Sequence, residues 1–525
     1  MSDVTLRYYQ KDAYPAIVKY LSENEGHHPL LAYPTGAGKT IILSDIVKNA
    51  LRDYDEHVLV LSHVKEILEQ DHQALDNYLK MPIGLYSSGM NSNSREQVTV
   101  AGIQSMYNKH ELFERYKIII VDECHLIPPK GDGMYQKFFK EIGDHTRIGL
   151  TATPYRLGTG YIYGPDAMFD DLIVDYTYME KFNELIEKGY LCDLRTFPTK
   201  VEMDVSGVRT IAGGFSDKDL SEQFDREEIT KAIVKEIINV GKNFNKALIF
   251  AIDIDHAEHI AEVLLQSGET AYVVHSKMGD KNRDNVVKMF KDGRIRYLVN
   301  VNILTTGFDA PDIDLICLLR PTKSPVLHVQ SIGRGLRVHP SKTYTMVLDF
   351  AGNTERLGPI NNITIRKKRE SKEKQDPVTK RCPQCNMIHA PAVRVCINCG
   401  WEFKFNVDLR LRSTDASIIA RHKVNVHDVD DVYYKVSEKP GRPNLLRVTY
   451  QCGLRQFVEN VCIEHGGYAG HKAKHWAMVR LPDEILTIDF MTANELYAIN
   501  HLLKRPKQIE VSEGGKYANI LKYVF

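Results

Sequence analysis

The segment Tyr33–Thr40 has the residue types and order of a phosphate-binding loop. It reads YPTGAGKT, with tyrosine at the first position of the motif in place of glycine, and lies between an apolar run and a helix-forming run. Glycines in such a loop let backbone N–H groups surround a phosphate, and the following helix adds a favourable dipole. Lys39 would reach the β- and γ-phosphates of ATP, and Thr40 would bind Mg²⁺. The predicted nucleotide-binding residues of this loop are Thr35, Gly36, Ala37, Gly38, Lys39 and Thr40.

A pair of carboxylates follows a second apolar run. Lys117–Val121 (KIIIV) predicts a buried strand, and Asp122 and Glu123 come directly after it. Because ligands bind at the carboxyl ends of parallel strands, we expect this pair beside the phosphate loop. We predict that Asp122 binds Mg²⁺ and that Glu123 orients and deprotonates the water that attacks the γ-phosphate.

Positive charge for the departing phosphoryl group is expected from a distant part of the chain. Gln330–Arg337 reads QSIGRGLR, and a spacing of three residues would place Arg334 and Arg337 on one face of a helix. Arginines that reach the transferred phosphoryl group contribute roughly 10³ to 10⁵ in rate. We therefore predict catalytic roles for Gln330, Arg334 and Arg337, at a cleft that opens and closes between two domains.

The phosphate loop, the carboxylates and the arginines must be positioned by regular secondary structure. The sequence contains short apolar runs, and each run is followed by a turn and an amphipathic helix. The runs lack polar alternation, which is typical of strands buried on both faces of a parallel sheet. They form two groups, and the pattern pauses near Tyr155. We predict an α/β fold with two doubly wound parallel-sheet domains. The expected strands include Leu30–Tyr33, His57–Leu61, Lys117–Val121 and Arg147–Leu150 in the first group, and Ala247–Ile252, Ala271–Val274, Tyr297–Val301, Asp314–Leu319 and Thr343–Leu348 in the second.

These motifs, in this order, resemble those of superfamily 2 helicases of the DEAD/DEAH type. YPTGAGKT resembles motif I, DECH (Asp122–His125) motif II, LTATPYR (Leu150–Arg156) motif III and QSIGRGLR motif VI. The resemblance implies two RecA-like domains and a nucleic-acid-dependent ATP hydrolase with ATP and Mg²⁺ as cofactors.

Further segments of the resemblance imply individual contacts. LRYYQ (Leu6–Gln10) resembles the adenine-reading element, with Gln10 on the base edge and Arg7 beside it. VNVNILTTGFDAP (Val299–Pro311) resembles motif V, which implies nucleotide contacts by Gly307 and Asp309. The nucleic-acid contacts that the resemblance implies are His63, Lys65, Gln104, Ser105, His275, Thr305 and Thr306.

Within the superfamily, KIIIVDECH, LTATPYRLGTGYIYG, IGRGLR and LDFAGN resemble the RadD-like family of bacterial DNA repair proteins. This resemblance implies single-stranded or branched DNA as the nucleic acid, and single-strand-binding protein and recombinase as partners. The match weakens after residue 405, and the shorter chain is compatible with a phage-encoded relative.

Four cysteines in the second half have the spacing of a zinc site. Cys382, Cys385, Cys396 and Cys399 form C-x₂-C-x₁₀-C-x₂-C, which predicts a closed tetrahedral Zn²⁺ site. Residues 361–381 before it hold eight Lys or Arg and three Asp or Glu, as in a solvated linker or one that also follows phosphates. The predicted boundaries are 1–175 and 226–360 for the two RecA-like domains, 176–225 for a connecting segment, 361–381 for the linker, 382–403 for the zinc module and 404–525 for a small α+β domain.

The last of these domains has a segment rich in basic and aromatic residues around Trp476. It contains His465, Tyr468, His471, Lys472, Lys474, His475 and Trp476. Two interpretations stay open: a basic aromatic helix that docks on DNA, or a tryptophan packed in a small core with its basic neighbours outside.

Composition limits the other function classes. The 525 residues hold 68 Lys and Arg and 68 Asp and Glu, so nucleic-acid binding must come from local patches. No apolar run approaches the roughly 18 residues of a membrane span, and five of nine cysteines are scattered. We expect a cytoplasmic protein without a membrane partner. The alternatives to a DNA motor are an RNA helicase, a restriction-system motor subunit and a nucleotide-switched platform that binds branched DNA without unwinding it.

Overall fold

The computed structural model forms two units, Met1–Ile162 with Val174–Ala420 and Tyr163–Ile173 with Arg421–Phe525. Within these, the structure describes residues 5–128, 133–158, 160–165, 167–197, 199–201, 203–205, 207–211, 213–303, 308–363, 380–381, 384, 388–389, 418–419, 424–438, 443–453, 455–465, 467–482, 492–512 and 519–525. None of the helices in these ranges is both long enough and apolar enough to cross a membrane.

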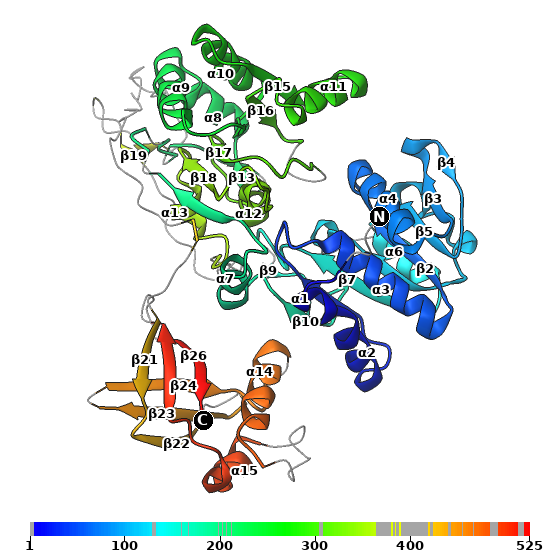
Figure 1. Cartoon of the computed structure of the whole chain (residues 1–525), viewed down its shortest axis with the longest axis vertical. Coiled ribbons are helices and arrows are strands. Elements are labelled where there is room, and N and C mark those ends of the chain that lie inside the picture. Colours follow the sequence, from blue (N-terminus) through cyan, green and yellow to red (C-terminus); the bar gives the residue numbers. More distant parts are fainter. Residues whose placement is uncertain are drawn as a thin grey trace. The chain divides into compact units, whose positions relative to one another are not determined.

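The first α/β domain is built on an eight-stranded sheet in the order β10-β1-β7-β6-β2-β5-β3-β4 (Figure 1). Its central strands pair in parallel, and β4 pairs antiparallel with β3 at the edge. The strands are β1 (Pro29–Ala32), β2 (His57–Ser62), β3 (Ile83–Ser87), β4 (Ser92–Asn93), β5 (Val98–Gly102), β6 (Tyr116–Val121), β7 (Thr146–Thr151) and β10 (Asp171–Asp175). Every residue of β1 and β5 is buried, which explains why these runs lack polar alternation.

Helices and short elements complete this domain. The helices are α1 (Tyr8–Lys11), α2 (Ala13–Glu23), α3 (Lys39–Tyr54), α4 (Lys65–Leu79), α5 (Ile103–Met106) and α6 (Met134–Glu141), with 3-10 turns at Ser88–Met90, His110–Leu112 and Cys124–Leu126. The strands β8 (Tyr155–Arg156) and β9 (Gly160–Tyr161) form an antiparallel pair.

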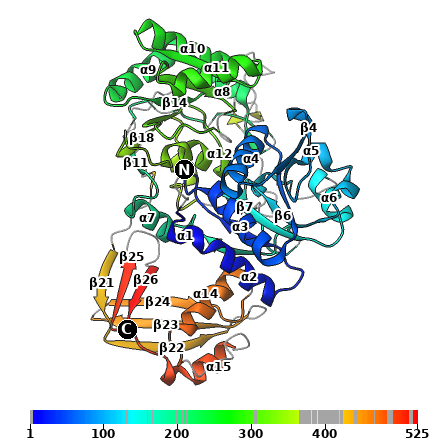
Figure 2. The same cartoon turned by 45° about the vertical axis from the view of Figure 1, so that its right-hand side comes forward.

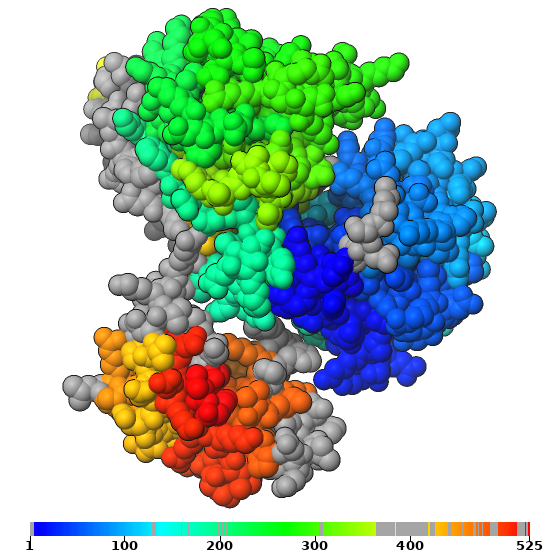
Figure 3. All heavy atoms as spheres, in the orientation of Figure 1, coloured from blue at the N-terminus to red at the C-terminus, as the bar shows by residue number. Residues whose placement is uncertain are grey.

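The second α/β domain has a six-stranded sheet in the order β11-β18-β17-β14-β16-β15, and all of its pairs are parallel. The strands are β11 (Asp193–Thr196), β14 (Ala247–Phe250), β15 (Ala271–His275), β16 (Tyr297–Val301), β17 (Leu315–Leu318) and β18 (Tyr344–Asp349). Two such parallel-sheet domains confirm the predicted fold class. Figure 3 shows them as blue-to-cyan and green blocks, because each is continuous in sequence.

The helices of this domain cover its sheet. They are α8 (Asp217–Phe224), α9 (Glu227–Gly241), α10 (Ile254–Gln266), α11 (Asp280–Lys291), α12 (Pro325–Gly333) and α13 (Asn353–Leu357), with a 3-10 turn at Arg334–Leu336. α7 (Met179–Glu187) instead contacts α1, where the hydroxyl of Tyr8 donates to Glu184 at 2.8 Å. Both cartoon views place α9 beside α10 (Figures 1 and 2), and their apolar faces share one core with the sheet. A two-stranded ribbon joins β12 (Thr210–Ile211) to β13 (Gly214–Phe215).

The segment predicted as a connector, 176–225, contributes to the second domain. β11 lies inside this segment and pairs with β18 at the edge of the second sheet. Leu220 and Phe224 of α8 are buried in the same core as the sheet. The sequence DLRT of β11 is short, and three of its four residues are polar, because an edge strand needs less apolar surface than a central one. It therefore does not stand out as a strand.

The second unit consists mainly of two three-stranded antiparallel sheets and two helices. One sheet contains β22 (Asp431–Ser437), β23 (Leu445–Cys452) and β24 (Arg455–Val461), and the other contains β21 (Val424–Asp428), β25 (Gln508–Ser512) and β26 (Asn519–Val524). The helices are α14 (Gly467–Met478) and α15 (Ala493–Ala498), followed by a 3-10 turn at Asn500–Leu502. In the first unit, after the second α/β domain in sequence, β19 (Lys380–Arg381) pairs with β20 (Ile388–His389).

The structure decides between the two interpretations of Trp476. Its side chain is 6% exposed and lies in the core of this unit. The indole Nε1 donates to Glu459 Oε1 at 2.6 Å, which satisfies the one polar atom of the buried ring. Trp476 is therefore a core residue, and it does not present a stacking surface to DNA.

Candidate functional site

The phosphate loop lies between β1 and α3, as its sequence predicts. Gly36 and Gly38 have φ angles of 88° and 80°, in the left-handed region that favours glycine. A Cβ at Gly38 would stand 2.7 Å from Nε2 of Gln10, so a side chain there would be strained by the backbone angle and would displace the Gln10 amide. α3 begins at Lys39, and the Nζ of Lys39 lies 3.4 Å from Oε1 of Glu123.

Gln10 and Tyr9 form hydrogen bonds to the backbone of the phosphate loop. Nε2 of Gln10 and the hydroxyl of Tyr9 both donate to the carbonyl of Ala37, at 3.1 and 2.8 Å. Oε1 of Gln10 accepts from the backbone N–H of Arg7 at 2.9 Å, and the Arg7 guanidinium lies over the ring of Tyr190. Gln10 thus contacts the loop, Arg7 lies beside it against Tyr190, and Tyr9 is a loop contact that sequence reasoning missed.

Asp122 and Glu123 follow β6 at the same sheet edge as the loop. Asp122 is buried, and its Oδ1 has no hydrogen-bond partner among the described residues. Burial, followed by the charge of Glu123, raises the pKa of Asp122 to about 7. A buried carboxylate oxygen without a partner fits a Mg²⁺ ligand, because the cation would supply the missing interaction.

Glu123 is held as an anion by two cations and by its contact with His125. Burial acts to raise its pKa, but Lys39, His125 and Arg334 overcome that effect and hold the pKa below its usual range. The backbone φ of Glu123 is 46°, which is uncommon for a residue other than glycine. The carboxylate therefore projects from a tight turn. A strained residue between a buried strand and a short 3-10 helix is typical of functional sites.

His125 connects the acidic motif to the second domain, and sequence reasoning gave it no role. Its Nε2 lies 3.1 Å from Nε2 of Gln330, which must be the donor if the ring nitrogen accepts. The proton then lies on Nδ1, which is 2.9 Å from Oγ1 of Thr151 and 3.2 Å from Oε2 of Glu123. One imidazole therefore contacts the predicted base, motif III and Gln330 of the second domain.

The structure corrects the expected geometry of the arginines. α12 ends at Gly333, Arg334 begins a 3-10 turn and Arg337 is extended, so the two do not share one face of an α-helix. The guanidiniums nevertheless converge, because Nη1 of each donates to the carbonyl of Phe308, at 2.7 and 2.8 Å. Burial lowers the pKa of Arg334 to about 9, and it also lowers the pKa of Arg337.

The remaining predicted nucleotide residues are placed as follows. Oδ1 of Asp309 forms an ion pair with Nε of Arg337 at 3.2 Å, so its carboxylate helps to orient this arginine in the structure. Thr40 is the second residue of α3. Gly307 lies outside the described residues.

The structure brings only some of the predicted nucleic-acid residues together. Nε2 of Gln104 donates to the carbonyl of His63 at 2.9 Å, while Oγ of Ser105 accepts from the N–H of Ser88. Lys65 begins α4 and lies 3.9 Å from Asp280 of the second domain. His275 is the last residue of β15, and Thr305 and Thr306 fall outside the described part of the chain.

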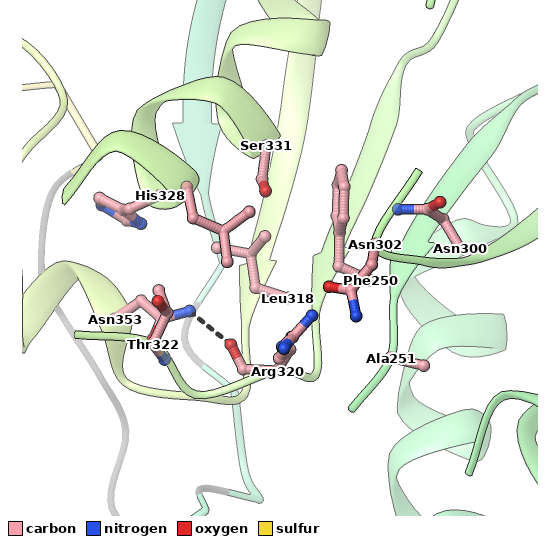
Figure 4. A pocket seen from close by; sticks show the side chains of 11 residues that line it. Phe250, Ala251, Asn300, Asn302, Leu318, Arg320, Thr322, His328, Ser331 and Asn353 are labelled. Atoms are coloured by element: carbon pink, nitrogen blue, oxygen red, sulfur yellow. Dashed lines mark hydrogen bonds between the residues drawn. The ribbon is translucent and has the colours of Figure 1, made fainter. Parts of the chain in front are cut away.

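A pocket lies where β14, β16 and β17 end in the second domain. Figure 4 shows Asn300, Asn302, Arg320 and Thr322 among its lining side chains. Nδ2 of Asn353 donates to the carbonyl of Arg320 at 3.0 Å, which holds the loop after β17 in place. The lining therefore includes several amide and hydroxyl groups, which suit phosphate and sugar oxygens, and the guanidinium of Arg320, which forms an ion pair with Asp217 at 3.1 Å.

The four predicted zinc ligands, Cys382, Cys385, Cys396 and Cys399, lie outside the described residues. Among the residues that the structure does describe, no group of three or more His, Cys, Asp or Glu side chains is arranged to hold a metal ion.

Comparisons with known proteins match both α/β domains. The family description "Type III restriction enzyme, res subunit" matches residues 3–156, and "Helicase conserved C-terminal domain" matches residues 229–339. The putative ATP-dependent helicase IRC3 of Saccharomyces cerevisiae is 30% identical over 378 residues, which cover 69% of this chain and 53% of the yeast protein. The chain thus spans about half the length of that relative.

Two further proteins are similar to this chain, one in sequence and one in fold. A 51.5 kDa protein of a Lactococcus phage is 27% identical over 407 residues, which cover 76% of this chain and 83% of the phage protein. The fold of a fragment of a putative HsdR subunit of a type I restriction enzyme from Vibrio vulnificus is similar, with a TM-score of 0.51 at 22% identity over 66% of this chain and 65% of the fragment.

Proposed function

We propose that this chain, which belongs to superfamily 2 of the helicases, hydrolyses ATP and uses the energy to move along DNA and to separate or remodel it. The observation that carries the proposal is the hydrogen bond between Gln330 and His125. It joins the acidic motif of the first domain to the arginine-bearing motif of the second. A change at the nucleotide can therefore act on both domains, which a motor requires.

The roles in hydrolysis follow from the charges of the site. The loop N–H groups and Lys39 would hold the phosphates, and Thr40 and Asp122 would hold Mg²⁺, which neutralises charge on the β- and γ-phosphates when bound. Glu123 is the anion that accepts a proton from water. The water oxygen bonds to the γ-phosphorus while the bond from that phosphorus to the β–γ bridging oxygen breaks, and ADP leaves. Arg334 and Arg337 would stabilise the charge on the transferred group.

We propose that the nucleic-acid strand binds at the edge of the second sheet where its β-strands end. Arg320 lies there, together with the amides of Asn300 and Asn302, which belong to the segment that resembles motif V. Contacts of this kind go to phosphates and sugars and carry no sequence preference. We propose DNA rather than RNA on the resemblance to RadD-like repair proteins, which also supports a role in repair, recombination or replication.

The decisive experiment is a steady-state ATPase assay of the full chain without nucleic acid and with single-stranded DNA, forked DNA or single-stranded RNA. Glu123→Gln, run in parallel, excludes a contaminating ATPase. Strong stimulation by DNA and little by RNA supports the proposal. Equal rates under all four conditions overturn a nucleic-acid motor, and a larger effect of RNA than of DNA makes RNA the substrate.

A restriction-system motor is the second candidate, because the res-subunit description matches residues 3–156. Such a motor acts with nuclease or methylase activity, which the sequence after residue 405 does not indicate. Cleavage of plasmid DNA by the purified chain, with or without a methylase, would favour this candidate. ATPase stimulated by forked DNA without strand release would instead favour the nucleotide-switched platform.

We also propose that Cys382, Cys385, Cys396 and Cys399 bind a structural Zn²⁺. The support is the spacing of the two C-x₂-C pairs, which suits four thiolates around one ion. Four protein ligands leave no position for a reacting water, so we assign no catalysis to this ion.

A further inference from the structure

The β22–β23–β24 sheet of the second unit uses only one of its faces for the core. The inward residues of all three strands are buried in one cluster with α14, α15 and β25. These inward residues include Val432, Leu446, Val448, Tyr450, Phe457 and Val461. Because side chains alternate along a strand, the residues between them point to the other face.

The outward residues form two neighbouring rows across the strands. In one row, Tyr433 lies opposite Thr449, which lies opposite Val458. In the next, Lys435 lies opposite Arg447, which lies opposite Asn460. Tyr433 is 53% exposed and Val458 37%, so the first row is an accessible aromatic and apolar strip.

The second row carries positive charge that the described residues do not neutralise. Lys435 and Arg447 are both exposed and directly opposite in register, and neither has an ion pair within the described part of the chain. Like charges placed opposite each other destabilise a sheet. Asp431, the acidic residue on this face of β22, is already paired with Arg505 at 2.8 Å. Glu459 of β24 points inward and accepts from Trp476 and Tyr523.

We propose that this open face, the Tyr433 face, binds single-stranded nucleic acid. A base would stack on the exposed ring of Tyr433, and the adjacent phosphate would lie between Lys435 and Arg447, one row away. Rows on one face are about 6.8 Å apart, close to the separation of successive nucleotides in an extended strand. An acidic peptide would use the two cations but would leave the tyrosine without a role, and a duplex would offer no free base to stack.

This site is separate from the nucleotide site, and it goes beyond the proposed motor. It would give the chain a second binding site for single-stranded nucleic acid, and binding there would not require ATP. It also differs from the helix around Trp476, because that indole is buried whereas Tyr433 is exposed.

The test is binding of a fluorescent oligothymidylate to the full chain without nucleotide, followed by anisotropy. Tyr433→Ala should weaken binding by roughly tenfold, within the range for loss of one stacked base, whereas Tyr433→Phe should bind normally. Lys435→Ala combined with Arg447→Ala should also weaken binding and reduce its dependence on salt. Lys504→Ala removes an exposed cation elsewhere in the same unit and serves as the matched control.

A second measurement locates the contact. An oligothymidylate with photoreactive bases should crosslink to the peptide that contains Tyr433, as identified by mass spectrometry. Unchanged affinity in both the Tyr433→Ala and the double-alanine variants, or crosslinks only within residues 1–360, would overturn the proposal. Loss of binding to polyglutamate but not to oligothymidylate in the double variant would make the surface an acidic-peptide site instead. The ATPase assay plays no part in this result, so the motor and the Tyr433 face can fail separately.

Discussion

The ammonium of Lys39 lies 3.4 Å from the carboxylate of Glu123, so the phosphate-binding cation and the predicted general base neutralise each other in this structure. Both groups are largely buried, which strengthens their attraction. A γ-phosphate in the loop would compete for Lys39, and Glu123 would then be free to take a proton from water. The same contact that binds ATP would therefore release the base for hydrolysis.

Replacing Glu123 with glutamine should abolish hydrolysis while ATP and Mg²⁺ still bind. The amide keeps the shape of the side chain but cannot accept the proton, so we expect a fall of roughly 10² to 10⁴ in turnover. Steady-state ATPase and nucleotide binding measure the two effects. Glu114→Gln, at an exposed position, is the matched control. Near-normal turnover in Glu123→Gln would exclude Glu123 as the base.

The Gln330–His125 hydrogen bond should couple the two domains. We expect Gln330→Ala and His125→Ala each to lower DNA-stimulated ATPase by roughly tenfold, and the double variant to be little worse than either, because the contact is already lost. Gln266→Ala changes an exposed glutamine of α10 and should have no effect. Additive losses in the double variant would show that the two side chains act independently.

Arg334→Ala should lower turnover on the order of 10³-fold with ATP binding retained, because a buried guanidinium would stabilise the transferred phosphoryl group. Circular dichroism and thermal unfolding must show an intact fold, since Arg334 also anchors Phe308. Arg294→Ala, at an exposed arginine, is the control. Equal losses in turnover and in ATP affinity would indicate a binding role instead.

Asp71 of α4 should make stability depend on pH. It is 1% exposed, and neither carboxylate oxygen has a partner among the described residues. Burial, and then the charge of Asp122, raises its pKa well above the usual value. A raised pKa means that stability is complete below the ordinary pKa of aspartate and is lost as pH rises toward the pKa in the folded state.

Asp71→Asn removes this effect, so the variant should unfold at a higher temperature than the unchanged chain at alkaline pH. The stability difference should approach about 1 to 3 kcal/mol and vanish at acidic pH. Thermal unfolding at a series of pH values measures it. Asp76→Asn, on the exposed side of the same helix, should show no such trend. A difference independent of pH would exclude the buried carboxylate as its cause.

Cys396→Ser should release the proposed zinc, because three thiolates hold the ion far less firmly than four. Elemental analysis of the purified chain should give one zinc per chain before the change and a marked loss after it. Cys317→Ser changes a buried cysteine of β17 and should keep the metal. Equal metal content in Cys396→Ser and the unchanged chain would reject the four-cysteine site.

The sequence by itself determined the local chemistry. The glycines and Lys39 of the loop, and the carboxylates after β6, are recognised because a few adjacent residues, a strand before and a helix after specify them. The same holds for the two parallel sheets, whose buried strands appear as apolar runs.

Tertiary structure decided what lies between these motifs. His125 and Gln330 are 205 positions apart, and no spacing rule pairs them. Arg334 and Arg337 meet at the carbonyl of Phe308 although the helix has ended, and Gln10 lies against the phosphate loop. Trp476 is buried while Tyr433 is exposed, although both are aromatic residues of one unit. Such contacts depend on how distant elements pack, because burial and partner choice are properties of the folded chain and not of a short segment.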